Sequence, residues 1–129
     1  MALVLVLEDD TTLRFAFCEA VRDVGLDVIS AASIDEATAL LRRFRPDVLL
    51  LDLMVGPDCS TDVADYAAVA APSAAVIYVT GSGLFPRGEI FDMSRNARLM
   101  LRKPVDLEEL ADMVRHVLPR TAADLRAAI

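Results

Sequence analysis

The sequence predicts a doubly wound α/β domain with a five-stranded parallel sheet and helices on both of its faces. Five short apolar runs alternate with segments whose apolar residues recur at helical spacing, a pattern that is typical of βαβ units. Most of these runs are continuously apolar, as expected of strands that are buried on both faces of a parallel sheet. Right-handed crossovers between such strands place helices on both sides of the sheet.

The first half of the chain is expected to form three strands and two helices. Leu3–Leu7 is a continuous apolar run, and the helical spacing after it predicts a helix over Thr11–Val24. Ser33 is a favourable N-cap for the second helix, and Glu36 completes a capping box. The buried side of that helix is predicted to contain Ala37, Leu40, Leu41 and Phe44. The strands before and after it are predicted at Leu26–Ala31 and Val48–Leu51.

The second half is expected to add the remaining helices and two strands after a loop at Val55–Ser60. Asp106 and Glu109 form a capping box for the last helix, which Pro119 ends or kinks. The other predicted elements are a helix at Asp62–Ala71, a strand at Ala74–Val79, a short helix within Glu89–Arg95 and a strand at Leu99–Leu101. The flavodoxin-like strand order 2-1-3-4-5 is the commonest solution for a parallel sheet of this length.

Composition limits the possible classes of function. The chain has 129 residues and a mass of 14.0 kDa, which fits one domain. Its net charge of −7 would repel phosphate backbones, so we expect no binding to nucleic acid. No apolar run approaches the roughly 18 residues of a membrane span. Cys18 and Cys59 do not form a disulfide framework. We therefore expect a cytoplasmic protein that does not bind membranes.

Polar residues follow four of the five predicted strands. They are Glu8, Asp9 and Asp10 after the first strand, Asp52 after the third, Thr80 after the fourth and Lys103 after the fifth. In the order 2-1-3-4-5 these strand ends share one edge of the sheet, where ligands bind to parallel sheets. Lys103 is the only lysine among 13 basic residues, which indicates a position where a compact ammonium group is needed.

This set of side chains is suited to phosphoryl transfer. Carboxylates at Asp9, Asp10 and Asp52 can all remain ionised at short range only if a cation compensates their charge. Carboxylate oxygens with room for water favour Mg²⁺. The hydroxyl of Thr80 and the ammonium of Lys103 would bind phosphoryl oxygens. Asp52 would then be the nucleophile.

Each of these residues also has a simpler interpretation. Asp9 and Asp10 could be helix N-caps, which is a common role for aspartate. Asp52 could be a loop acid, Thr80 could simply end a strand, and Lys103 could be an exposed charge. Their joint position at four strand ends on one edge favours a common site.

With these motifs, the sequence resembles the receiver domains of two-component response regulators over residues 1–118. The motifs that carry the resemblance are Glu8-Asp9-Asp10, Leu51-Asp52, Val79-Thr80-Gly81 and Lys103-Pro104, in the order and spacing of that family. The resemblance implies a signalling phospho-acceptor that catalyses only its own phosphorylation and dephosphorylation, and otherwise is not an enzyme.

The resemblance also implies a role for each site residue. Asp52 would accept the phosphoryl group from a sensor histidine kinase or a histidine phosphotransfer protein. Thr80 and Lys103 would bind that group, and the Lys103–Pro104 bond would be cis. The implied Mg²⁺ ligands are Asp9, Asp10, Asp52 and the main-chain carbonyl of Met54.

The sequence departs from the family at the switch. The family usually has an aromatic residue where this chain has Met100, and that residue moves together with the one equivalent to Thr80. Methionine is flexible and adapts to a pocket without marking two discrete states. We therefore expect Ser82–Asn96 to be the bistable element, since its glycines and proline weaken local order. The alternative is that its apolar residues only pack under the loop as a small satellite core.

We expect residues 1–118 to form a stand-alone receiver domain and residues 119–129 a C-terminal tail or helix extension. Output would pass to an unidentified downstream protein, through a phosphorelay, or through a possible homodimer. One alternative is a pseudo-receiver, which binds proteins independently of phosphorylation. Another is a small hydrolase with an aspartate nucleophile, although Asp52-Leu53-Met54 lacks the second acid of such enzymes. His116 is expected to be solvated or packed.

Overall fold

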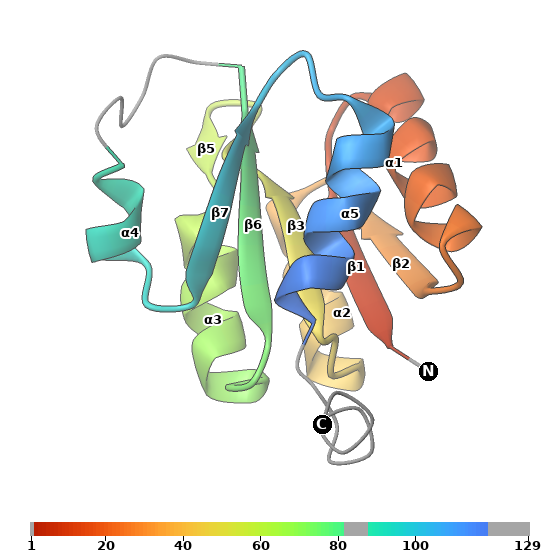
Figure 1. Ribbon diagram of the computed structural model, residues 1–129. Helices are drawn as coiled ribbons and strands as arrows, with labels where there is room; N and C mark the ends of the chain where they lie inside the picture. The colour runs from red at the N-terminus through yellow and green to blue at the C-terminus, as the bar shows by residue number, and fades with distance from the viewer. Residues whose placement is uncertain (1, 82–87, 119–129) are drawn as a thin grey trace, which may run out of the picture.

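A five-stranded parallel sheet lies between two layers of helices in the computed structural model, which describes residues 2–81 and 88–118 (Figure 1). Its strands are β1 (Leu3–Leu7), β2 (Asp27–Ala31), β3 (Val48–Asp52), β6 (Ala75–Thr80) and β7 (Ala97–Arg102). They are arranged in the order β2-β1-β3-β6-β7. The predicted order 2-1-3-4-5 is therefore confirmed, because β4 and β5 belong to a separate hairpin.

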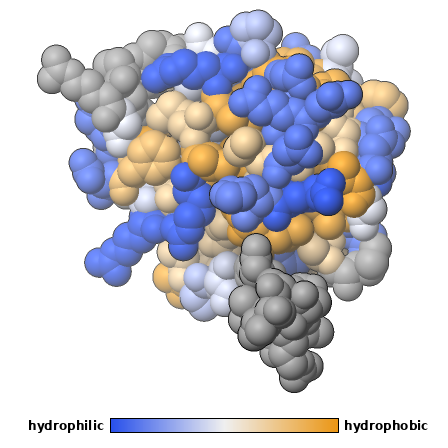
Figure 2. All heavy atoms as spheres, in the orientation of Figure 1, coloured by the Kyte–Doolittle hydropathy of each residue, from blue (hydrophilic) through white to orange (hydrophobic). Residues whose placement is uncertain are grey.

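The helices cover both faces of the sheet. Figure 1 shows α1 (Thr11–Asp23) and α5 (Leu107–Val117) on one face, and α2 (Ile34–Arg43) and α3 (Thr61–Ala70) on the other. The short helix α4 (Ile90–Met93) lies beside the edge strand β7. On the face that carries α5, hydrophilic residues lie next to hydrophobic patches (Figure 2), as expected for an amphipathic helix packed on a sheet.

Alternation along the strands divides the apolar residues between two cores. The core under α1 and α5 includes Val4, Val6, Leu50, Ile77 and Val79. The core under α2 and α3 includes Leu5, Leu7, Leu49, Leu51 and Tyr78. Every residue of β3 and β6 is buried. A shift by one residue would exchange the two faces, so burial fixes the register of these strands.

The register brings four strand ends together. Leu7 is paired with Leu51, Asp52 with Val79, and Thr80 with Arg102. The carboxyl ends of β1, β3, β6 and β7 therefore lie at one edge of the sheet, where the sequence predicts the site.

Two helices have the side-chain N-caps that the sequence predicts. The Ser33 hydroxyl accepts a hydrogen bond from the Glu36 N–H at 3.2 Å, and Glu36 in return accepts one from the Ala32 N–H at 3.0 Å. Asp106 accepts a hydrogen bond from the Glu109 N–H at 3.0 Å. The capping box at Ser33 and the N-cap at Asp106 are confirmed.

Several predicted boundaries are wrong. The expected loop after Asp52 contains a hairpin, β4 (Met54–Val55) paired with β5 (Asp58–Cys59), and Gly56 in its turn has a φ of 60°. Phe44 is not on the buried side of α2. Its backbone is extended, its side chain is 37% exposed, and the helix ends at Arg43. Strand β7 begins two residues before the predicted strand, at Ala97.

Some predictions lie outside the described residues. These are the C-terminal tail at 119–129 and the part of the expected switch at 82–87. The described part of that switch contains α4, a helix of four residues. Among the described residues, no helix has both the length and the apolar character that crossing a membrane requires.

Candidate functional site

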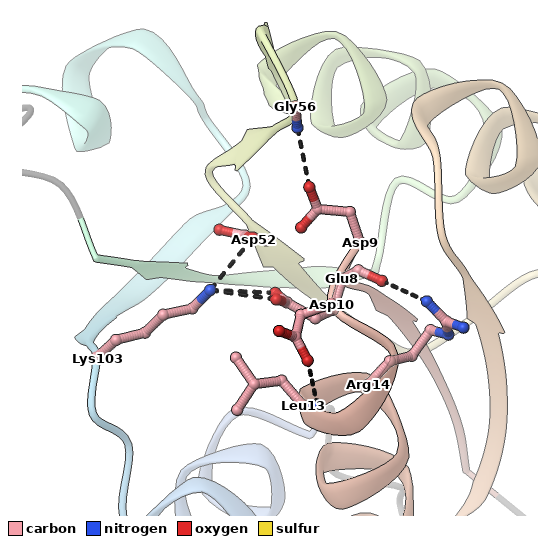
Figure 3. Close-up of polar contacts among 8 residues, drawn as sticks. All are labelled: Glu8, Asp9, Asp10, Leu13, Arg14, Asp52, Gly56 and Lys103. Atoms are coloured by element: carbon pink, nitrogen blue, oxygen red, sulfur yellow. Dashed lines mark hydrogen bonds and ion pairs between the residues drawn. The ribbon is translucent and has the colours of Figure 1, made fainter.

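Three carboxylates meet at the carboxyl edge of the sheet. One oxygen from each of Glu8, Asp9 and Asp52 lies within 4.8 Å of the other two (Figure 3). Glu8 and Asp52 are buried, with exposed fractions of 1% and 6%, whereas Asp9 is exposed. The group therefore consists of two buried acids and one acid that is exposed to solvent.

The Lys103 side chain reaches across the sheet edge to the two buried acids. Its Nζ lies 3.2 Å and 3.4 Å from the two oxygens of Glu8, and 3.3 Å from Oδ2 of Asp52. The Lys103 N–H donates to the Thr80 carbonyl at 2.8 Å, which continues the pairing of β7 with β6. The Lys103–Pro104 peptide bond is cis. Lys103 is thus the internal counter-charge of the acidic group.

Burial and the proximity of these charged groups shift the pKa values of Glu8 and Lys103. Burial raises the pKa of Glu8 to about 7, with a further contribution from the Asp52 carboxylate and against the opposing effect of Lys103. Burial alone would lower the pKa of Lys103, but Asp52 and Glu8 more than offset this effect and raise it. The ammonium therefore stays charged while Glu8 titrates near neutral pH.

The structure does not bring Asp10 into this group. Its carboxylate caps α1 by accepting a hydrogen bond from the Leu13 N–H at 2.9 Å. The third acid that lies near Asp9 and Asp52 is Glu8, and the role of Asp10 as a metal ligand stays a prediction. The available signal for the cap was the position of Asp10 directly before Thr11, where the helical pattern begins.

The exposed acid Asp9 contacts the hairpin after Asp52. The Gly56 N–H in the hairpin turn donates to Asp9 Oδ2 at 3.1 Å (Figure 3). On the other side of the acidic pair, Arg14 donates to the Glu8 carbonyl at 2.9 Å. These two bonds hold the chain after β1 in place between the hairpin and α1.

The remaining predicted site residues lie on β6, on β7 and in the hairpin after β3. Thr80 ends β6 and is 2% exposed. Met54 follows Asp52 by two residues, and the Leu53 N–H between them donates to the Val79 carbonyl at 2.8 Å. Met100 is partly buried in β7, in register with Tyr78. The roles expected of Thr80, Met54 and Met100 remain predictions.

Comparison with known proteins gives a consistent result. Residues 4–115 match the family described as "Response regulator receiver domain". The chain is 29% identical over 118 residues to the probable transcriptional regulatory protein TcrX of Mycobacterium tuberculosis, covering 92% of this chain but 50% of TcrX. It is 27% identical to Protein PilH of Pseudomonas aeruginosa, covering 92% of this chain and 98% of PilH.

Solved structures show the same fold. A CheY-like response regulator receiver domain protein from Methanospirillum hungatei superposes with a TM-score of 0.81 at 22% identity, covering 90% of this chain and 92% of that one. The chain spans between 17% and 59% of the length of the first three curated relatives that it matches. Likeness to those relatives therefore concerns only a part of each.

The raised pKa of Glu8 predicts a pH-dependent stability in the absence of metal. Between pH 4.5 and about 7 the folded chain keeps a proton on Glu8 that the unfolded chain has lost. The free energy of unfolding should therefore fall as the pH rises through this range. Urea unfolding at a series of pH values measures it. Glu8→Gln should remove this fall, and Glu19→Gln, at an exposed ion pair, should retain it. An unchanged profile in Glu8→Gln would contradict the assignment.

Proposed function

The chain belongs to the response regulator receiver domain family, and from this premise we propose that it accepts a phosphoryl group on Asp52 from a phosphorylated histidine of a partner protein. The position of Asp52 carries this proposal. It is a buried carboxylate at the carboxyl end of a central strand, beside two further acids and in contact with the only lysine of the chain.

The donor set in the structure fits Mg²⁺. Glu8, Asp9 and Asp52 offer hard oxygen ligands close together, and the exposure of Asp9 leaves room for water, which Mg²⁺ usually retains. When bound, the ion supplies the positive charge that allows an anionic phosphoryl group to approach three carboxylates. We propose the main-chain carbonyl of Met54 as a further ligand.

The chemical step is a single displacement at phosphorus. An oxygen of Asp52 forms a bond to phosphorus, and the bond from phosphorus to the imidazole nitrogen of the donor breaks, with its electron pair remaining on that nitrogen. Lys103, which already contacts Asp52 at 3.3 Å, would donate to a phosphoryl oxygen. Thr80 would donate its hydroxyl to another. Both residues stabilise negative charge, and neither forms a covalent bond.

The proposed partners follow from this chemistry. The donor is a sensor histidine kinase or a histidine phosphotransfer protein, because phosphohistidine is the group that a receiver domain accepts. TcrX is named a probable transcriptional regulatory protein, and this chain covers only half of its length. We therefore limit the proposal to residues 1–118 as the receiving domain, which passes its signal to a downstream protein.

Asp52 should be the only phosphorylated residue. Wild-type protein incubated with acetyl phosphate and Mg²⁺ should gain one phosphoryl group by intact-mass measurement, because Asp52 lies at the carboxyl end of the central strand β3, beside two further acids and in contact with Lys103. Asp52→Asn should gain none. Asp58→Asn, which changes an exposed acid of the nearby hairpin, should be labelled like the wild type. Equal labelling of Asp52→Asn would show that another residue is the acceptor.

Mg²⁺ binding should distinguish Glu8 and Asp9 from Asp10. Glu8→Gln and Asp9→Asn each remove a ligand, so calorimetry should show affinity reduced by at least about tenfold, a loss that even outer-shell changes can cause. Asp10→Ser is the matched control, because serine also caps helices and the carboxylate is lost. Its affinity should stay near that of the wild type. A loss in Asp10→Ser as large as in Asp9→Asn would contradict the site as assigned.

A further inference from the structure

A continuous chain of buried hydrogen bonds begins at Tyr78, in the centre of the sheet. The Tyr78 hydroxyl lies 3.1 Å from the Ser94 hydroxyl. Ser94 donates to Asn96 Oδ1 at 3.1 Å, and the Asn96 amide nitrogen donates to the Ala64 carbonyl at 3.0 Å. Tyr78, Ser94 and Asn96 are 0%, 1% and 8% exposed. This series of hydrogen bonds therefore runs through the interior of the domain, where it is shielded from solvent.

The direction of every bond in this chain is determined. The Ala64 carbonyl can only accept, so the Asn96 amide nitrogen must face it and Oδ1 must face Ser94. Ser94 has one hydroxyl proton, which it gives to Oδ1, so Tyr78 must be the donor to Ser94. Burial raises the pKa of Tyr78 to about 12, which keeps its proton in place at neutral pH.

These hydrogen bonds connect residues of β6, α3 and α4. Tyr78 belongs to β6, and Ala64 to α3. Ser94 is the C-cap of α4, where its N–H donates to the Ile90 carbonyl at 2.9 Å. Asn96 immediately precedes β7, and its carbonyl accepts a hydrogen bond from the Val76 N–H at 2.8 Å. These bonds thus connect Tyr78 to the C-terminal end of α4.

Tyr78 is also linked to the acidic site through its own strand. It precedes Thr80 by two residues, so both side chains lie on the same face of β6. The cross-strand partner of Tyr78 is Met100, a partly buried and flexible side chain. Such a neighbour can follow a movement of the tyrosine ring, because it repacks without leaving a cavity.

We propose that Tyr78 is a positioning residue that transmits the state of the Asp52 site through Ser94 to α4. The inference rests on the proposed function, since it requires phosphorylation to move Thr80 and the end of β6. Because the surrounding side chains are apolar, water does not replace a lost partner, and the Tyr78–Ser94 bond is either made or broken. Loss of this bond would free the side chain of Ser94 at the C-terminal end of the four-residue α4 and allow that end of the helix to shift.

The tyrosine content of the chain provides a direct probe. The sequence has two tyrosines and no tryptophan, so Tyr66→Phe leaves Tyr78 as the only tyrosine. In this variant, Mg²⁺ with beryllofluoride as a phosphoryl mimic should change the tyrosine fluorescence. The mimic should also change amide hydrogen exchange across residues 89–97. In Tyr78→Phe, which removes only the hydroxyl, that exchange response should be lost.

Intact-mass measurement separates this inference from the proposed function. Both tyrosine variants should be phosphorylated on Asp52 by acetyl phosphate. If the wild type is not phosphorylated, the proposed function is wrong. If Tyr78→Phe is phosphorylated and still shows the full exchange response at residues 89–97, the relay is wrong. Should Tyr78→Phe not fold, Ser94→Ala interrupts the same chain from the other side, and it must lose the response as well. A retained response in Ser94→Ala would overturn the inference.

Discussion

The close approach of three carboxylates is the constraint on which the site depends. Glu8, Asp9 and Asp52 offer oxygens within 4.8 Å of one another, and two of these acids are buried. Burial is the main reason why the pKa of Glu8 rises to about 7, and the neighbouring Asp52 carboxylate adds to it. Lys103 contacts both buried acids and is their internal counter-charge. The proposed Mg²⁺ would therefore add a second positive charge to a site that already contains one.

Apolar burial in the sheet stabilises the arrangement that keeps these charges close together. The central strands β3 and β6 are buried over their whole length, and the two apolar cores on either face fix their register. Apolar burial thus offsets the repulsion at the strand ends. Thr80 and Tyr78 belong to the same buried strand, and the proposed relay depends on this connection. The packing of β3 and β6 thus positions the acids and also links the site to the buried residues of these strands.

The sequence was sufficient for those features that depend on local pattern. The strand order, the helix caps and the placement of Asp52 beside Lys103 follow from apolar periodicity and from the rule that strand ends share an edge. The choice between Glu8 and Asp10 was beyond that reasoning, because an aspartate before a helix looks the same as a cap or as a ligand. The hairpin was missed because its two strands have only two residues each, too few for an alternating pattern, and the Gly56 N–H in its turn contacts Asp9, which is distant in sequence.

The most direct test of this account is the affinity of Lys103→Met for Mg²⁺. The measurement is made by calorimetry at low ionic strength and at a pH well above the titration of Glu8. If Lys103 is the internal counter-charge, its removal leaves the acids uncompensated, and Mg²⁺ should bind more tightly than to the wild type. Lys103→Arg, which retains the charge, should remain close to the wild type. An unchanged or weaker affinity in Lys103→Met would contradict the account.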